Sequence, residues 1–485
     1  MTTELRRVID PLQRWWGMVT VWHAVAFTST VIYTAWLAVR TTRDHFGLGT
    51  SAYDFGLYDQ GIWLLSQGNA PFVTLMGRNL FGDHTSFILL PLVPLYWVVG
   101  STGLLFVVQA LWLGIGALPV WKTARLLLLS PAMACVAVAA YLLHPALTYT
   151  GMENFHPDAA LAPLIAWSLY AAIGYRWVQY IVSVVLILMV KEDTALFVSA
   201  LGLWVALRRD RRIGLLTVFG SLWLCILLLF AVMRGIVGVP YRNEWRLPFG
   251  GFGGVLKTAV TRPDKLLAHL MSSERPLYLL QLLAPVGFVA LLRPEIALLG
   301  TLPLLSNLVS TFWYQSQIEY HYAVQFVPIL VIGAFYGISR ITEHLRIWVV
   351  SAVLVGSLVC AYLWTPLPLM RTEMPRWSPS HPAVAAAHEA INRVPDDAVV
   401  SAYHTLTAHM ARRERIYVFP TPYRRVLYGP NVFAKGDRLP FAEEIQYVVL
   451  PRELEGEAAV DWQREQVFFE VVYGNDWWTV YERLR

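Results

Sequence analysis

Eleven long apolar runs, separated by short polar stretches, dominate this sequence. Backbone N–H and C=O groups have no water partners inside lipid, so an apolar run of spanning length favours a helix. Only 15% of the 485 residues are charged, against about 25% in soluble proteins. The sequence therefore predicts a polytopic α-helical membrane protein, with spans near residues 15–39, 102–121, 128–147, 159–175, 177–190, 194–207, 213–233, 276–292, 295–312, 322–339 and 347–365.

Arginine and lysine positions predict the orientation, because cytoplasmic loops are enriched in these residues. Arg6, Arg7 and Arg14 place the N-terminus in the cytoplasm, and the basic stretch at 208–212 falls on the same side. Eleven alternating spans fit this pattern only if the proline-containing run at 87–99 is an interfacial helix and not a span. The segments expected outside the plasma membrane are 41–86, 148–158, 191–193, 238–275, 313–321 and everything after 365.

After residue 365 the composition becomes polar and proline-rich, which marks a domain boundary. The pattern of the tail predicts helices and strands in alternation. The expected helices are 381–394 and 405–412, and the expected strands are 398–402, 415–420, 444–451, 466–474 and 477–484. We therefore predict a membrane domain over 1–365, with its first outer segment at 41–100, and a small extracytoplasmic α/β domain over 366–485.

Charge and cysteine content narrow the range of partners. The net charge of +5 suits basic loops beside anionic lipid, so the bilayer is an expected partner. The sequence has no basic–aromatic arrays typical of nucleic-acid binding, and no glycine-rich phosphate loop that would indicate a nucleotide-driven pump. The three cysteines lie in apolar runs without metal-ligand spacing.

The first outer segment concentrates acids beside aromatic residues. A carboxylate next to a cavity at the membrane surface can act as a general base, so Asp54 and Asp59 are the catalytic candidates. The alternative for Asp54 is a helix N-cap. Asp83 and His84 follow in the same segment, where they either line the site or form a cap or buried hydrogen-bonded pair.

Two further outer stretches carry candidate ligands. Glu153, His156 and Asp158 lie in GMENFHPDAA, where carboxylate and imidazole groups could bind a divalent metal such as Mg²⁺ or Mn²⁺ or supply a second acid. The alternative is that Asp158 caps the following helix. Tyr320 and His321 begin a late span, where they line the site or belong to the interfacial aromatic belt.

The turn at 191–193 joins two spans of about 14 residues each, too short for a hydrocarbon core of about 30 Å. The turn should therefore lie below the outer surface, where ionisable residues are usually functional. We predict that Lys191, Glu192 and Asp193 line a functional site; the alternative is a self-neutralised cluster that locks helix packing. Arg242 and Arg246, in the long outer loop, are phosphate candidates, with a solvated face as their alternative.

Several motifs together resemble a known family. YDFGLYDQGIWLLSQG, GDHTSFILLPLVPLYW, HPALTYTGMENFHPDAALAP, LMVKEDTALF, EYHYAVQFVPIL and LTAHMARRERIYVFP resemble a bacterial and archaeal family of predicted membrane proteins over nearly the whole chain. The order of features also resembles the GT-C glycosyltransferases, which include protein O-mannosyltransferases and aminoarabinose transferases. These features are an acid after the first span, an interfacial Pro-Leu-Tyr-Trp helix, an acid before the fourth span, a lysine-containing turn and a His-Tyr span start.

The resemblance implies a role for individual residues. Asp54 matches the acid that activates the acceptor, Asp158 matches the second outer acid, and Lys191 matches the lysine of the short turn. His321 matches the His-Tyr pair. By this resemblance, Lys191 and His321 are expected to bind the donor phosphate together with Arg242 and Arg246. The chain departs from the mannosyltransferases in having Phe after Asp54, where they have Glu.

The function that the resemblance implies is transfer of a hexose or pentose from a polyprenyl-phosphate donor. The acceptor would be an envelope glycan, lipid or protein outside the plasma membrane. The alternatives are a transporter or flippase of a lipid-linked precursor, and a non-catalytic envelope assembly protein.

Overall fold

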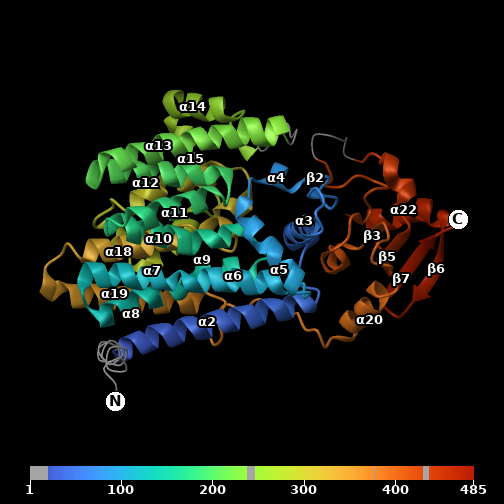
Figure 1. The fold of residues 1–485 in the computed structure, drawn as a ribbon, viewed down its shortest axis with the longest axis horizontal. Coiled ribbons are helices and arrows are strands. Elements are labelled where there is room, and N and C mark those ends of the chain that lie inside the picture. The colour runs from blue at the N-terminus through green and yellow to red at the C-terminus, as the bar shows by residue number, and fades with distance from the viewer. Residues whose placement is uncertain (1–19, 237–245, 376, 430–435, 485) are drawn as a thin grey trace, which may run out of the picture.

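The computed structural model describes residues 20–236, 246–375, 377–429 and 436–484. A long bundle of helices carries a smaller α/β domain at one end (Figure 1). Helix α2 (Val21–Phe46) runs along one edge of the bundle toward that domain. The first outer segment, which includes α3 (Leu57–Ser66), lies between the bundle and the C-terminal domain.

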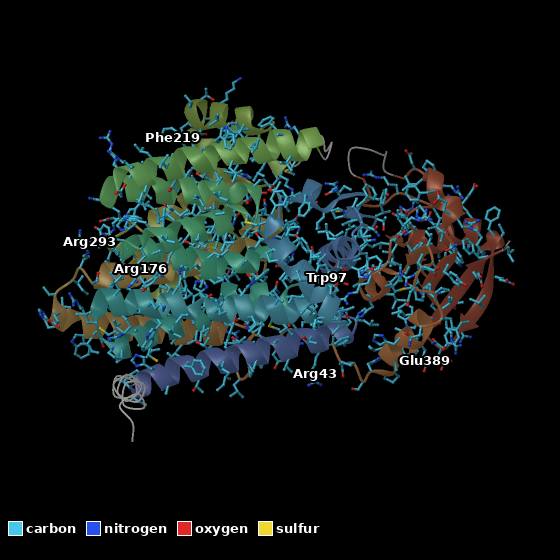
Figure 2. The ribbon with its side chains drawn as sticks, viewed as in Figure 1. Arg43, Trp97, Arg176, Phe219, Arg293 and Glu389 are labelled. Carbon is cyan, nitrogen blue, oxygen red and sulfur yellow. The ribbon has the colours of Figure 1, made fainter. Side chains whose placement is uncertain are left out.

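Helix α18 (Phe326–Ile338) forms the centre of the bundle, since all 13 of its residues are buried. In contrast, α13 (Arg211–Ile226) exposes apolar side chains such as Phe219 on the outer face (Figure 2). An apolar exterior of this kind suits lipid. The other bundle helices are α6 (Leu104–Ile115), α7 (Ala117–Leu128), α8 (Pro131–Leu142), α9 (Pro145–Met152), α10 (Leu161–Ile173), α11 (Trp177–Leu188), α12 (Ala195–Arg208), α16 (Arg275–Leu283), α17 (Thr301–Val309) and α19 (Glu343–Trp364). The short helices α14 (Phe252–Thr261) and α15 (Pro263–Leu270) pack against each other, and α15 also contacts α17.

The multi-pass helical class is confirmed. In the described residues, five helices are long and apolar enough to cross a membrane, and the bent pair α8 and α9 could form a sixth span. Each of the eleven expected runs contains helix within the described chain, but the count of eleven spans stays a prediction. One boundary was wrong: α2 continues to Phe46, because an ion pair between Arg40 and Asp44 stabilises its last turns.

The run at 87–99 forms a short helix, a 3₁₀ stretch (Phe87–Leu92) followed by α5 (Val93–Val98). Trp97 is exposed and lies near the junction with the C-terminal domain (Figure 2). Arg176 and Arg293, two residues that the charge pattern assigns to the cytoplasm, lie at the opposite end of the bundle. The interfacial position of the 87–99 run and the orientation in the membrane stay predictions.

The C-terminal domain contains a five-stranded sheet of order β4-β3-β5-β7-β6. Strand β3 pairs in parallel with β4 and β5, whereas β7 is antiparallel to β5 and β6. The expected strands and helices are confirmed with shorter bounds. These are β3 (Val400–Ala402), β4 (Ile416–Val418), β5 (Tyr447–Pro451), β6 (Phe469–Gly474), β7 (Trp478–Arg483), α20 (Pro382–Ile391) and α21 (His404–Thr407), with α22 (Gly456–Glu465) in addition.

The first outer segment is bonded to the C-terminal domain. Its hairpin, β1 (Phe72–Val73) and β2 (Arg78–Asn79), brackets Thr74, whose Oγ1 donates to the carbonyl of Ile416 at 2.8 Å and accepts from its N–H at 2.9 Å. The side-chain amide of Gln60 donates to Thr74 Oγ1 at 2.8 Å and to the carbonyl of Arg413 at 3.1 Å. Hydrogen bonds to the C-terminal domain therefore hold the segment that carries Asp54 and Asp59 in place.

Candidate functional site

Asp54 lies in a π-helical turn (Ala52–Gly56) that precedes α3. Ser51 caps this turn by accepting a hydrogen bond from the Tyr53 N–H at 3.1 Å, so Asp54 is not the N-cap. The Asp54 side chain is 42% exposed, and its carboxylate lies 3.6 Å from His156 Nε2. Single π-helical turns inside helices often mark functional sites, because the extra residue redirects the side chains of that turn.

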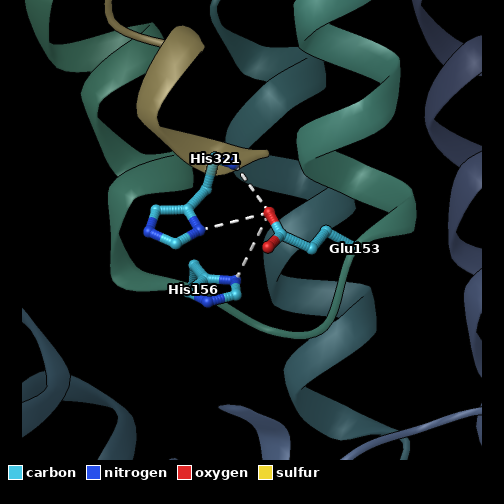
Figure 3. A group of neighbouring side chains, drawn as sticks. All are labelled: Glu153, His156 and His321. Atoms are coloured by element: carbon cyan, nitrogen blue, oxygen red, sulfur yellow. Dashed lines mark hydrogen bonds and ion pairs between the residues drawn. The ribbon is translucent and has the colours of Figure 1, made fainter. Parts of the chain in front are cut away.

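Glu153, His156 and His321 lie together in one group (Figure 3), and His156 is the member that contacts Asp54. Glu153 Oε2 accepts from the His321 N–H at 2.6 Å, lies 3.1 Å from His321 Nδ1 and lies 4.0 Å from His156 Nδ1. The two imidazole rings stack with centroids 3.7 Å apart. We call these three residues and Asp54 the carboxylate–histidine cluster.

Nearby opposite charges shift the pKa values of Asp54 and His156. Burial raises the pKa of Asp54, but the interaction with His156 and the charges of His156 and His321 outweigh it and hold that pKa below its usual range. Burial lowers the pKa of His156, but Glu153 and Asp54 outweigh this effect and raise it to about 9. The Asp54 carboxylate is therefore ionised at neutral pH.

Glu153, His156 and His321 could hold a metal ion, since their ligand atoms all lie within 4.8 Å of one another. Two imidazoles and one carboxylate suit Zn²⁺ or Mn²⁺ better than Mg²⁺, which prefers oxygen ligands. The trio differs from the expected one, because His321 takes the place of Asp158. The carboxylate of Asp158 instead faces Lys191.

Lys191 and Asp158 form a buried ion pair, with Nζ 3.1 and 3.3 Å from the two carboxylate oxygens. The ammonium also lies over the Tyr322 ring, 5.4 Å from its centroid. Lys191 is buried, with 5% of its surface exposed, whereas the depth of the whole turn in the membrane stays a prediction. Asp158 does not cap the following helix; it provides the counter-ion that a buried ammonium requires.

Glu192 links the turn to the first outer segment. Its carboxylate lies 2.8 Å from His84 Nδ1 and accepts from the Thr85 N–H at 3.2 Å. Asp83 lies 3.6 Å from Arg78 and 3.9 Å from His84, so neither Asp83 nor His84 caps a helix. The neighbouring Asp193 is exposed.

Asp59 is fully buried and does not join the carboxylate–histidine cluster. Its carboxylate accepts from Arg412 Nε at 3.1 Å and from the Tyr96 hydroxyl at 2.8 Å. Arg412 belongs to the C-terminal domain and also donates to the carbonyls of Gly100 and Ser101. In contrast to Asp54, Asp59 therefore has a complete set of partners.

Two of the remaining candidates lie near the cluster. The Tyr320 ring packs edge-on against Trp313, and Tyr320 lies within electrostatic range of both Glu153 and Asp54. The guanidinium of Arg246 lies over the Phe312 ring, and Arg246 and Lys191 both act electrostatically on Tyr322. Arg242 lies outside the described residues.

Comparison of the chain with known protein families identifies one family that matches it. The family described as "Predicted membrane protein (DUF2079)" matches residues 44–483. The chain belongs to this family. Comparison with curated proteins finds no match for this DUF2079 member.

The fold resembles two solved structures of ArnT from Cupriavidus metallidurans. The structure bound to undecaprenyl phosphate has a TM-score of 0.55 at 12% identity, with 96% of this chain and 98% of that chain covered. The apo structure has a TM-score of 0.50 at 12% identity, with 95% and 98% covered. At this identity the likeness shows a shared GT-C-like fold and no more.

Sequence patterns did not single out Gln109, Asn154 or Arg412. Gln109 could have been found as the one amide side chain in the otherwise apolar helix α6. Asn154 lies in the GMENFHPDAA motif, where only the ionisable residues were considered as candidates. Arg412 belongs to the C-terminal domain, far along the chain from its partner Asp59. Only the fold brings Gln109 to His156, Asn154 to Ser51 and Arg412 to Asp59.

Proposed function

We propose that this DUF2079 protein is an integral-membrane glycosyltransferase that uses a polyprenyl-phosphate sugar. The observation that carries the proposal is the partly exposed Asp54 carboxylate, held ionised beside His156 in the turn that precedes α3. Lys191 and Arg246 supply positive charge around Tyr322, near the same cluster. The GT-C-like fold is shared with an ArnT structure bound to undecaprenyl phosphate, which supports a lipid-phosphate donor here.

In the proposed reaction, Asp54 takes the proton of an acceptor hydroxyl. The hydroxyl oxygen forms a bond to the anomeric carbon of the sugar, the bond from that carbon to the phosphate oxygen breaks, and polyprenyl phosphate leaves with the electron pair. Lys191 and Arg246, together with Arg242, bind the phosphate and stabilise its charge as it leaves. A divalent cation held by Glu153, His156 and His321 would supply Lewis-acid stabilisation of phosphate charge.

The acceptor is an envelope glycan, lipid or protein on the extracytoplasmic face. This side follows from the charge pattern and is testable by labelling. A cysteine at Asp476, which is 96% exposed in its side chain, should react with an impermeant reagent added outside the cell, whereas a cysteine at Arg209 should not. External labelling at position 209 alone would reverse the orientation.

The decisive experiment is transfer from radiolabelled polyprenyl-phosphate sugars in membranes that contain the full chain. The expected result is transfer that Asp54→Asn lowers by about 10²–10⁴-fold. Asp264→Asn should leave it unchanged, because Asp264 is an exposed acid in a surface pair. If no sugar donor supports transfer, the enzyme proposal is lost. Export or flipping of a labelled lipid precursor by the same membranes would then favour the transporter.

A further inference from the structure

We propose that Gln109 is a positioning residue of the carboxylate–histidine cluster and acts on Asp54 through Asn154. This proposal rests on the glycosyltransferase function for its kinetic test, but the contacts that carry it are structural. Gln109 is 1% exposed and lies in the middle of α6, whose other side chains are apolar or aromatic. A buried amide in such a helix needs partners, and its choice of partners reveals what it holds.

Every partner of the Gln109 side chain lies in one short stretch, residues 150–156. Its Nε2 lies 3.2 Å from the carbonyl of Thr150, 3.2 Å from that of Gly151 and 3.4 Å from that of Asn154. Its Oε1 accepts from the His156 N–H at 2.8 Å. These are the last carbonyls of α9 and the backbone just beyond it, which have no partner within that helix.

This stretch carries two members of the cluster, Glu153 and His156. Because Gln109 binds the backbone on both sides of Glu153 and at His156 itself, it fixes where both side chains begin. The His156 ring is then oriented by its Nδ1, which lies 3.0 Å from the Asn154 carbonyl.

The same stretch also fixes the turn that carries Asp54. Asn154 Oδ1 accepts from the Ser51 N–H at 2.9 Å, and the Ser51 hydroxyl caps the π-helical turn. The chain of contacts therefore runs from Gln109 through Asn154 and Ser51 to the proposed base. Misplacement of a catalytic group by about 1 Å can cost about 10²-fold in rate, so loss of this chain should act on the chemical step.

A matched control is a residue of a neighbouring helix that also hydrogen-bonds to α6. Tyr141 of α8 donates its buried hydroxyl to the Leu113 carbonyl of α6 at 2.7 Å. This hydrogen bond is also a buried side-chain-to-backbone contact between bundle elements, but it reaches no part of the 150–156 stretch. Tyr141→Phe therefore removes one buried hydrogen bond, keeps the packing of the ring, and should leave the cluster undisturbed.

The test compares Gln109→Met, Gln109→Glu and Tyr141→Phe in the reconstituted full-length protein. Gln109→Met keeps the length of the side chain and removes its amide; we expect kcat to fall by about 10²-fold while KM for the polyprenyl-phosphate sugar hardly changes. Gln109→Glu keeps the acceptor for the His156 N–H. Because burial favours the protonated carboxyl, it can also donate to one of the carbonyls, so it should recover part of kcat. Tyr141→Phe should leave kcat unchanged. An unchanged kcat in Gln109→Met, or an equal loss in Tyr141→Phe, would overturn the proposal.

Asn154 provides a second pair of variants if Gln109→Met does not accumulate. Asn154→Ala removes the acceptor for the Ser51 N–H, whereas Asn154→Asp keeps it, so the aspartate should retain more of kcat. Equal losses in both would contradict the proposed path to Asp54.

Hydrogen exchange separates failure of this proposal from failure of the glycosyltransferase function. Gln109→Met should speed exchange of the amides at 150–156 and 51–56, and Tyr141→Phe should not. If the wild-type protein transfers no sugar but exchange changes in this way, the positioning network stands and the proposed reaction fails. Unchanged exchange in Gln109→Met overturns the network, whether or not the protein transfers sugar.

Discussion

Asp54 and Asp59 lie five residues apart in one segment, yet their surroundings are opposite. The Asp54 side chain is 42% exposed and lies 3.6 Å from a single imidazole nitrogen. Asp59 is fully buried and accepts from Arg412 and Tyr96. Asp54 belongs to the π-helical turn, and Asp59 belongs to the first turn of α3. The Asp54 side chain faces His156 of the carboxylate–histidine cluster, whereas the Asp59 side chain faces Arg412 of the C-terminal domain.

The difference separates a carboxylate available for chemistry from one used for structure. A carboxylate whose lone pairs are occupied by a guanidinium and a hydroxyl cannot readily accept a proton from a substrate. A partly exposed carboxylate can, provided that nearby positive charge keeps it ionised. These surroundings favour Asp54 over Asp59 as the proposed base, and they make Asp59 a candidate for holding the two domains together.

The largest expected effect comes from removing the charge of Asp54. Asp54→Asn should lower sugar transfer by about 10²–10⁴-fold, the usual contribution of a general base, without loss of protein from the membrane. Transfer rates in membranes, normalised to protein amount, provide the measurement. Near-normal transfer by Asp54→Asn together with an inactive but well-folded Asp59→Asn would exchange the two roles.

The next effect concerns stability at the junction. Arg412→Gln leaves Asp59 buried without its counter-ion, and removal of one partner of a buried pair typically costs about 3–5 kcal/mol. We expect the thermal transition in detergent to fall sharply for Arg412→Gln and to recover partly in the double variant Asp59→Asn with Arg412→Gln. A single variant as stable as wild type would mean that the ion pair does not hold the domains together.

A smaller effect should follow at the buried turn, where Lys191 has both a protein partner and a proposed phosphate partner. Lys191→Met with Asp158→Leu removes both charges and should restore accumulation that Lys191→Met alone reduces. The double variant should still bind the polyprenyl-phosphate sugar more weakly, by about 1.5–3 kcal/mol for one charged hydrogen bond. Unchanged donor affinity in the double variant would make this pair purely structural.

The smallest change is expected in metal affinity. Glu153→Gln keeps the size of the side chain but removes the anionic ligand, so binding of Zn²⁺ or Mn²⁺ measured by calorimetry should weaken by at least about tenfold. Glu319→Gln is the matched control, because Glu319 is an exposed acid of the same region outside the trio. Equal binding by wild type and Glu153→Gln would exclude a metal at this position.

Local pattern determined much of the architecture. Apolar runs of spanning length predict helices because lipid offers the backbone no other partners. Short runs rich in β-branched and aromatic residues predicted the strands of the C-terminal domain, for example β5 and β7, to within a few residues. The extension of α2 to Phe46 escaped this reasoning, because an ion pair and buried residues continue the helix after its apolar run ends.

The candidate site was only partly readable from the sequence. The stretches that carry Asp54, Glu153 and His156, Lys191, and His321 were all predicted to contribute, since acids, histidines and a lysine are conspicuous beside apolar runs. The pairings were not predictable, because they join residues far apart in the chain. Glu153 meets His321, Lys191 meets Asp158, and Asp59 meets Arg412 of the other domain.

The sequence by itself determined that this chain forms a helical membrane domain followed by an α/β domain, because hydropathy and periodicity are local properties. Only the tertiary structure decided that the Asp54 carboxylate stays partly exposed and that the nearby Asp59 carboxylate pairs with Arg412. That choice depends on which partner each carboxylate meets, and the partners come from segments up to 353 residues away in the chain. Packing sets those distances, and the free energy of a buried charge depends on them more than on the identity of the residue.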